Sequence, residues 1–255
     1  MSSRDESGTR VRSVDRAFDI IECLQALGGG RVTDVAESLD MAKSTVHGHL
    51  ATLESRRYVV KEGDTYHVGL RFLNAGTAAR ARRDIYPVVK RKIKRLASDT
   101  GERVQFMLEE HGRGIHVVRY RGHRSVRTDA RIGDPRYLHT NAAGKSILAH
   151  LPETRVDAIV DRWGLPALTE RTITDRAELD ERLATVRERG YATNREERIE
   201  GLEAVGAPVL DANGRVLGAV SVSGPARRID DDAHRTEIRS ELLGVVDEIE
   251  LDYRT

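Results

Sequence analysis

The first sixty residues carry three short segments in which apolar residues recur at helical spacing. Residues 14–27 predict a helix with one apolar stripe, formed by Ala17, Ile20, Ile21, Leu24 and Leu27. The glycines at 28–30 end it, and a second short helix is predicted over residues 34–39. A third helix is predicted over residues 42–56, where Val46, Leu50 and Leu53 share one face.

Polar residues gather near the start of the third helix, mostly away from its apolar face. They are Lys43, Ser44, Thr45, His47 and His49. A hairpin is predicted at residues 61–66, where Gly63 and Asp64 lie between residues that favour strands. Three helices followed by a hairpin are the order of a winged helix-turn-helix, which reads the major groove of DNA. Lysine and histidine can donate to guanine, and serine and threonine can contact either phosphates or bases.

A further helical segment over residues 70–84 is interpreted as a linker between two domains. The segment 80–95 is strongly basic, with eight Lys and Arg residues and one acid, Asp84. Such a stretch either forms salt bridges with other parts of the fold or contacts DNA, and we favour salt bridges.

Beyond residue 103 the pattern becomes a mixture of strands and helices. A hairpin is predicted around Gly112–Gly114, a strand near 125–131, and a helix capped by Thr140 or Asn141. Helices are predicted at 153–163, 176–189 and 231–251, and a last hairpin turns at Asp211–Gly214. Because the strands pair through tight turns, the fold class is α+β with an antiparallel sheet.

Composition narrows the function classes. With 39% hydrophobic and 33% charged residues, a net charge of +1 and no long apolar run, the chain reads as a soluble protein without a membrane span. The polar residues 1–12 predict a frayed tail and no signal peptide. The single cysteine, Cys23, fits the reducing cytoplasm.

Motifs for catalysis are missing from the sequence. It contains no nucleophile elbow, no phosphate-binding glycine loop and no metal-ligand spacing, so we predict neither an enzyme nor a metal or other cofactor. A Ser-His-Asp hydrolase and a purely architectural DNA-binding protein stay open as alternatives. The second is disfavoured, because an architectural protein does not need so large a second domain.

Several separated motifs together resemble the IclR family of transcriptional regulators. Residues 43–53 resemble the recognition helix of the family and residues 69–73 the start of its linker. Further similar segments follow in the expected order, at 138–149, 168–174, 189–192, 201–208 and 219–225.

The resemblance implies a winged helix-turn-helix over 11–69, a linker helix over 70–85 and a GAF/PAS-like effector-binding domain over 86–255. It implies homodimers or homotetramers that bind a double-stranded DNA operator, with affinity set by a small-molecule effector such as an organic acid or a sugar-derived metabolite. The effector site implied by the resemblance comprises Ala142, Ala143, Asn194, Leu202, Ala204, Ser221 and Ser223. Ser221 and Ser223 also alternate with valines, so both point to one face of their strand.

Three positions depart from the family pattern. The family commonly has a large basic residue where Gly48 stands and an apolar residue where His49 stands. Glycine inside a helix costs about 1 kcal/mol relative to alanine and removes a possible DNA contact. Asn194 stands where relatives that bind keto acids often have an acid, which predicts a more neutral or more hydroxylated ligand.

Overall fold

The computed structural model describes residues 10–126, 131–229 and 232–254. The chain divides into two compact units between Arg82 and Arg83. The sequence places the change of domain within the same region, and its finer limits stay a prediction. Each unit has its own buried core and is described by itself.

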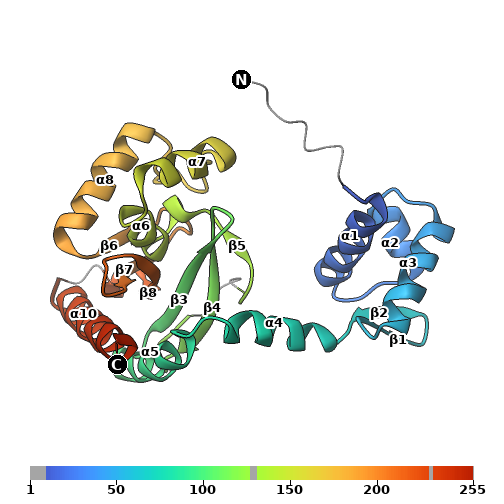
Figure 1. Cartoon of the computed structure of the whole chain (residues 1–255), viewed down its shortest axis with the longest axis horizontal. Helices are drawn as coiled ribbons and strands as arrows, with labels where there is room; N and C mark the ends of the chain where they lie inside the picture. The colour runs from blue at the N-terminus through green and yellow to red at the C-terminus, as the bar shows by residue number, and fades with distance from the viewer. Residues whose placement is uncertain (1–9, 127–130, 230–231, 255) are drawn as a thin grey trace. The chain divides into compact units, whose positions relative to one another are not determined.

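The N-terminal unit is a three-helix bundle with a two-stranded wing (Figure 1). Its elements are α1 (Arg12–Leu27), α2 (Val32–Ser38), α3 (Lys43–Ser55), β1 (Val59–Glu62) and β2 (Thr65–Val68). The predicted apolar positions Ile20, Leu24, Val46 and Leu50 form the core, together with Tyr66 from the wing. The three helices and the hairpin are therefore confirmed, with α3 within one residue of its predicted ends.

Helix α4 (Arg71–Ala81) follows the wing. Its first turn is held by Tyr58, whose ring centroid lies 4.8 Å from that of Phe72. Every residue of α4, all within the described chain, is exposed or half-buried. The helix predicted over 70–84 is present, but it is shorter than the pattern indicated.

The C-terminal unit is built on one antiparallel sheet of six strands in the order β5-β4-β3-β8-β7-β6. The strands are β3 (Arg103–Glu110), β4 (Arg113–Arg121), β5 (Pro135–Arg136), β6 (Ala192–Arg195), β7 (Leu202–Leu210) and β8 (Val216–Pro225). The turn between β7 and β8 is the predicted one, since Asp211 Oδ1 accepts from the backbone N–H of Asn213 and of Arg215, both at 2.9 Å.

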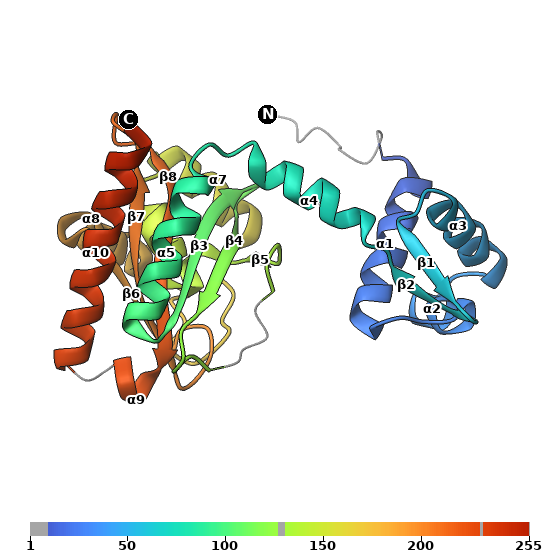
Figure 2. The same ribbon diagram turned by 90° about the horizontal axis from the view of Figure 1, so that it is seen from below.

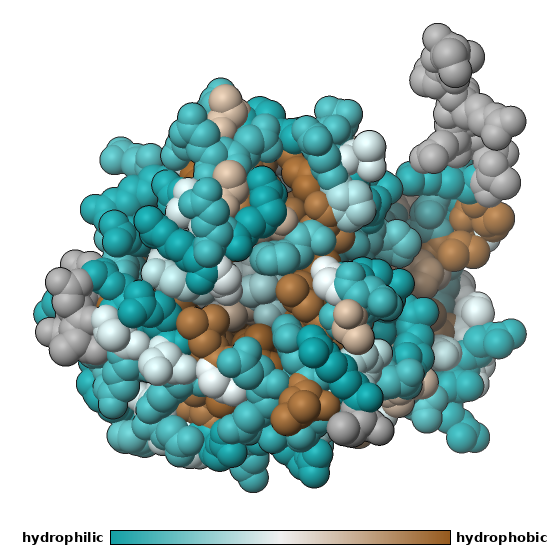
Figure 3. All heavy atoms as spheres, turned by 60° about the vertical axis from the view of Figure 1, so that its left-hand side comes forward, coloured by the Kyte–Doolittle hydropathy of each residue, from teal (hydrophilic) through white to brown (hydrophobic). Residues whose placement is uncertain are grey.

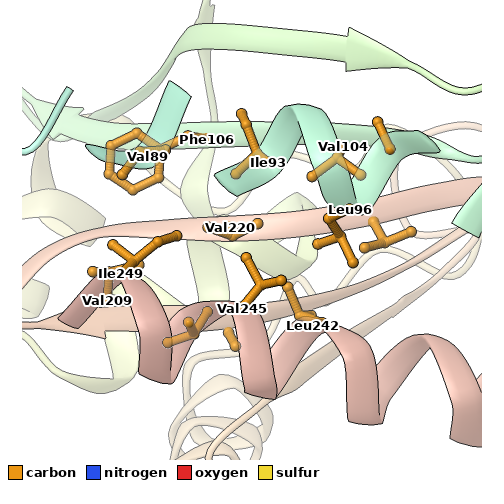
Figure 4. Packing of buried hydrophobic residues seen from close by; sticks show 14 of the residues in the cluster. Val89, Ile93, Leu96, Val104, Phe106, Val209, Val220, Leu242, Val245 and Ile249 are labelled. Atoms are coloured by element: carbon orange, nitrogen blue, oxygen red, sulfur yellow. The ribbon is translucent and has the colours of Figure 1, made fainter. Parts of the chain in front are cut away.

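Helices cover both faces of the sheet. Helices α5 (Tyr86–Thr100) and α10 (Asp232–Arg254) lie on one face, as Figure 2 shows from below. Helices α6 (Ala142–Ala149), α7 (Glu153–Trp163) and α8 (Arg176–Arg189) lie on the other, and α9 (Ala226–Ile229) follows β8. The first face buries apolar residues of β3, β7, β8 and both helices, as Val104, Phe106, Val220, Leu242 and Ile249 illustrate in Figure 4.

The basic stretch at 80–95 is largely engaged in ion pairs within this unit. Lys92 Nζ lies 2.9 Å from Glu248 and 3.1 Å from Asp252 on α10, and Arg95 lies 2.8 Å from Glu248. Arg83 pairs with Glu110 at 3.6 Å. These pairs favour the salt-bridge interpretation over DNA contact for this stretch.

Some elements differ from the sequence prediction. The pattern does not predict strand β6, and it predicts the last hairpin from its turn at Asp211–Gly214 without indicating that β7 begins as early as Leu202. Most of the strand predicted near 125–131 falls on residues 127–130, outside the described residues, as do most of the tail at 1–12 and the predicted start of the last helix at Asp231.

In the described part of the chain, no helix is both long and apolar enough to cross a membrane. The face of the C-terminal unit turned forward in Figure 3 is mostly hydrophilic, with hydrophobic residues in small groups.

Candidate effector pocket and DNA-reading helix

A cavity of about 60 Å³ lies on the α6 face of the sheet. Strand alternation explains its position: Val104, Phe106, Val220 and Val222 point to the α5–α10 core, so Arg103, Gln105, Ser221 and Ser223 point the other way. In the register, Arg103 pairs with Ser223 and Gln105 with Ser221. The sheet thus presents a polar floor beside the apolar residues that support α6.

Six of the seven residues predicted for the effector site line this cavity. They are Ala142, Asn194, Leu202, Ala204, Ser221 and Ser223. Ala143 is buried in the core beneath α6 and is not among the lining residues. The remaining lining residues are Arg103, Gln105, His116, Arg136, Asn141, Arg198, Ile199 and Glu203.

The lining is predominantly basic, which the sequence reasoning missed. Arg103 comes from β3, Arg136 from β5 and Arg198 from the segment between β6 and β7, whereas Glu203 is the one carboxylate of the lining. Alternation along β3 could have identified Arg103 and Gln105, because they alternate with Val104 and Phe106 as the two serines alternate with valines. No comparable signal marks Arg136 or Arg198.

Several polar atoms of the lining are buried without a hydrogen-bond partner among the described residues. They are Gln105 Oε1, His116 Nδ1, Arg136 Nε and Ser223 Oγ. A buried polar atom with an unmade hydrogen bond costs about 1–3 kcal/mol, so four such atoms around one cavity favour a ligand there.

Asn194 contributes to the wall and is itself held by the protein. Its Oδ1 accepts from the backbone N–H of Glu197 at 2.9 Å, and its Nδ2 donates to Thr140 O at 3.3 Å. The amide therefore fixes the chain at the edge of the cavity. The ligand charge inferred from Asn194 alone is outweighed by the three arginines around it.

Behind the cavity lies a buried ion pair between Lys145 on α6 and Glu197. Their side chains are 0% and 4% exposed. Burial lowers the pKa of Lys145 to about 8, although Glu197 opposes the shift. The pair holds the start of the segment that carries Arg198 and Ile199.

Helix α6 is packed directly against the sheet. Asn141 caps it as predicted, with Oδ1 accepting from Gly144 N at 2.8 Å. Ser146 Oγ donates to Gly206 O at 2.9 Å, and a Cβ added to Gly206 would lie 2.7 Å from the carbonyl carbon of Ala142. Because Asn141 Oδ1 accepts from the Gly144 amide, that amide is not available to a ligand.

In the N-terminal unit, α3 exposes the residues predicted to read DNA. Lys43, Ser44 and His47 are exposed, whereas Thr45 and His49 are half-buried. The N-cap residue of α3 is Ala42, so neither Ser44 nor Thr45 occupies the capping position. At 3.6 residues per turn, His49 lies about 200° around the helix from His47. A Cβ at Gly48 would meet nothing within 4 Å, which leaves the middle of the exposed face bare.

Models of known families match both units. The IclR helix-turn-helix domain matches residues 13–63, and the family described as bacterial transcriptional regulator IclR C-terminal matches residues 77–251.

Curated relatives match along most of their length. A probable HTH-type transcriptional regulator ArcR of Halobacterium salinarum is 34% identical over 250 residues, 96% of this chain and 95% of the relative. The regulator BhcR of Paracoccus denitrificans is 32% identical over 233 residues, 91% of this chain and 83% of the relative.

Solved structures have the same fold. The IclR protein of Thermotoga maritima superposes with a TM-score of 0.82 at 27% identity, covering 96% of this chain and 100% of that one. An IclR homologue of Microbacterium hydrocarbonoxydans complexed with 4-hydroxybenzoate gives 0.81 over 95% and 99%, and at 20% identity it shows the fold alone. Because the matches cover both units, the chain belongs to the IclR family of transcriptional regulators, DNA-binding proteins whose operator binding is modulated by a small metabolite in the C-terminal domain.

Proposed function

We propose that this protein is a homo-oligomeric cytoplasmic regulator, without catalytic activity, whose effector is a small organic anion bound in the cavity on the α6 face. The observation that carries the proposal is the convergence of Arg103, Arg136 and Arg198 on one small cavity. Arg103 is buried, and Arg136 and Arg198 are half-buried, so these like charges repel one another across the cavity. A bound anion relieves this repulsion and accepts charge-assisted hydrogen bonds.

The size of the cavity supports a ligand of few atoms. A cavity of about 60 Å³ holds about four water-sized groups, which suits a two- or three-carbon acid better than a sugar. Of the two ligand classes expected from the sequence, we therefore favour the organic acid.

For the DNA end we propose that Lys43, Ser44 and His47 make the main contacts of α3, with Thr45 and His49 at its margin. Exposure at the start of the helix supports the first group, since backbone amides there also attract phosphate. His49 lies toward the side of α3 that packs on the core of its own unit, so we assign it the role of positioning the helix rather than of reaching a base.

Oligomerisation through a second copy of this chain is supported by apolar residues left exposed in the N-terminal unit. Val14 and Phe18 on α1 are 50% and 56% exposed, and Leu70 and Leu73 at α4 are 81% and 65% exposed. A helix of 11 residues with no buried residue is marginal in water, so we propose that α4 has a partner for its apolar side. Light scattering should give a dimer or tetramer for the full chain and a smaller species for Leu73→Glu.

The effector proposal is tested by thermal unfolding of the full chain with acetate, oxalate and inorganic phosphate against the neutral acetamide. A bound anion should stabilise the C-terminal unit in a concentration-dependent way, by about 2.7 kcal/mol at one hundred times its Kd. Equal stabilisation by acetamide, or none by any anion, contradicts the proposal. It would also revive the architectural DNA-binding alternative, which predicts no ligand response.

A genome-wide binding profile of the tagged protein then gives the operator. The proposal expects discrete sites whose occupancy changes when the stabilising anion is supplied to cells. Uniform coverage of the chromosome would contradict it.

A further inference from the structure

The cavity contains a buried acceptor, Gln105 Oε1, that an anion alone does not satisfy, and a second buried polar atom, His116 Nδ1, whose role is set by its tautomer. Gln105 and His116 are each only 7% exposed, and both line the cavity. Gln105 Oε1 and His116 Nδ1 have no hydrogen-bond partner among the described residues. A carboxylate is an acceptor only, so it can bond to the arginines and the serines but cannot donate to a carbonyl oxygen.

Gln105 presents its oxygen from the floor of the sheet. It lies in β3 opposite Ser221, one alternation from Arg103, and therefore faces the same side of the sheet as both. A buried amide oxygen left without a donor is expensive in a low-dielectric site, so the bound state should supply an N–H or O–H.

His116 is held neutral by its surroundings. It lies in β4, and the charged groups that act on it come from several elements. Burial first, and then four arginines, lower the pKa of His116 to about 3: Arg198, Arg136, Arg119 and Arg103. A neutral imidazole carries one N–H and one bare nitrogen, so His116 provides a second acceptor to the cavity in the tautomer that leaves Nδ1 bare.

We propose that the effector is a small hydroxy acid, whose carboxylate is held on the arginine side of the cavity and whose hydroxyl donates to Gln105 Oε1 or to the bare nitrogen of His116. This inference rests on the proposed anionic effector and adds its second functional group. The hydroxyl of the ligand then uses both of its hydrogen-bonding functions: it donates its proton to one of these acceptors and accepts a hydrogen bond from Ser223 Oγ.

The neighbouring charges separate a hydroxy acid from the other acids of its size. A keto acid offers an oxygen in place of the O–H and leaves both acceptors unsatisfied. An amino acid offers N–H donors, but its ammonium group would enter a cavity where three arginines face one carboxylate. A site built to hydrogen-bond a hydroxyl rejects the analogue that lacks it far more strongly than an apolar pocket does.

The test compares matched ligand pairs by isothermal titration of the full chain at pH 7: lactate against pyruvate, and glycolate against acetate. The expected result is at least tenfold tighter binding of the hydroxy acid in at least one pair. Binding of both members within twofold in both pairs overturns this inference and leaves the anionic effector standing. Failure of all four to bind overturns the inference, and the proposed function falls with it only if oxalate and phosphate also fail to stabilise the chain.

Variants assign the selectivity to the two acceptors. Gln105→Met and His116→Leu should each reduce the hydroxy-to-keto ratio at least threefold, while binding of pyruvate or acetate changes less. Gln25→Met on α1 and His123→Leu are matched exposed controls and should keep the wild-type ratio. An unchanged ratio in both folded cavity variants contradicts the assignment; if neither variant folds, the ligand pairs measured on the wild-type chain still decide the proposal.

Discussion

Helix α3, which we propose reads DNA, and the cavity proposed for the effector arrange their polar residues in opposite ways. On α3 the polar side chains follow one another along a single exposed helix, and the apolar half of the same helix anchors them. In the cavity the polar side chains come from several strands and connecting segments, and most are buried. A surface of the first kind gains specificity from the DNA that it meets, whereas the second is already shaped and charged before its ligand arrives.

The difference predicts where a substitution has large effects. Groups in the buried site were desolvated on folding, so the removal of one leaves its neighbours without a partner. Groups on α3 stay hydrated, so each contributes little to stability and acts only on binding.

The largest effect is expected at the buried pair behind the cavity. Lys145→Met leaves the carboxylate of Glu197 buried without its cation and should destabilise the C-terminal unit by about 3–5 kcal/mol. Urea unfolding followed by circular dichroism measures it. The double variant Lys145→Met/Glu197→Leu should recover most of the loss.

The exposed pair Arg215–Asp211, 3.9 Å apart with Arg215 80% exposed, is the matched control. Arg215→Met should change stability by less than about 1 kcal/mol. If Lys145→Met also lowers the free energy of unfolding by less than about 1 kcal/mol, the buried pair contributes no more to stability than a surface pair.

The next effect is a pH dependence of stability due to His116. Its pKa is about 3 in the folded protein and about 6.5 when unfolded, so between these values the unfolded state binds more protons. The contribution of neutral His116 to the free energy of unfolding is complete above pH 6.5. It decreases as the pH falls, and the loss at pH 5 is about 2 kcal/mol. The wild-type protein should lose this much more stability than His116→Gln between pH 7 and pH 5, as followed by chemical unfolding. Parallel pH profiles for the two proteins would contradict it.

A smaller effect is expected for one cavity arginine. Arg136→Gln should weaken binding of the stabilising acid roughly 10- to 100-fold, the loss of one charge-assisted hydrogen bond, with little change in operator binding without effector. Titration calorimetry measures the affinity. Arg189→Gln, on the exposed surface of α8, should have no effect. Equal behaviour of the two variants would remove Arg136 from the site.

The smallest effect is expected at the bare position of α3. Gly48→Arg should tighten operator binding and steepen its salt dependence by about one unit of slope, because one more phosphate is neutralised. Gel-shift assays over a range of salt concentrations test this. Gly244→Arg is the control, since Gly244 is also an exposed helix glycine with open space at its Cβ. If affinity and slope stay unchanged in Gly48→Arg, this position does not face DNA.

The same difference explains what the sequence could predict. The winged unit could be predicted element by element, because the period of Val46, Leu50 and Leu53 orients every residue of α3 at once. The resemblance to the family supplied six of the fourteen lining residues of the cavity, and alternation of the serines on β8 supported two of them. Arg136 could not be predicted, because it is brought beside β4 by a strand of only two residues. The pairing of Lys145 with Glu197 joins positions 52 residues apart. The helical or strand periodicity of a short segment cannot predict a contact between residues so far apart in the sequence.

The close packing of α6 on Gly206 has a consequence for how such a protein can change over generations. Any other side chain at Gly206 would collide with the backbone of Ala142, so substitutions at Gly206 would disrupt the packing of α6 on the sheet. Arg136 and Arg198 lie on short edge or connecting segments, where a new side chain disturbs little else. The effector specificity of a descendant of this chain can therefore change by single substitutions at the edge of the cavity, while the residues that form its floor stay the same.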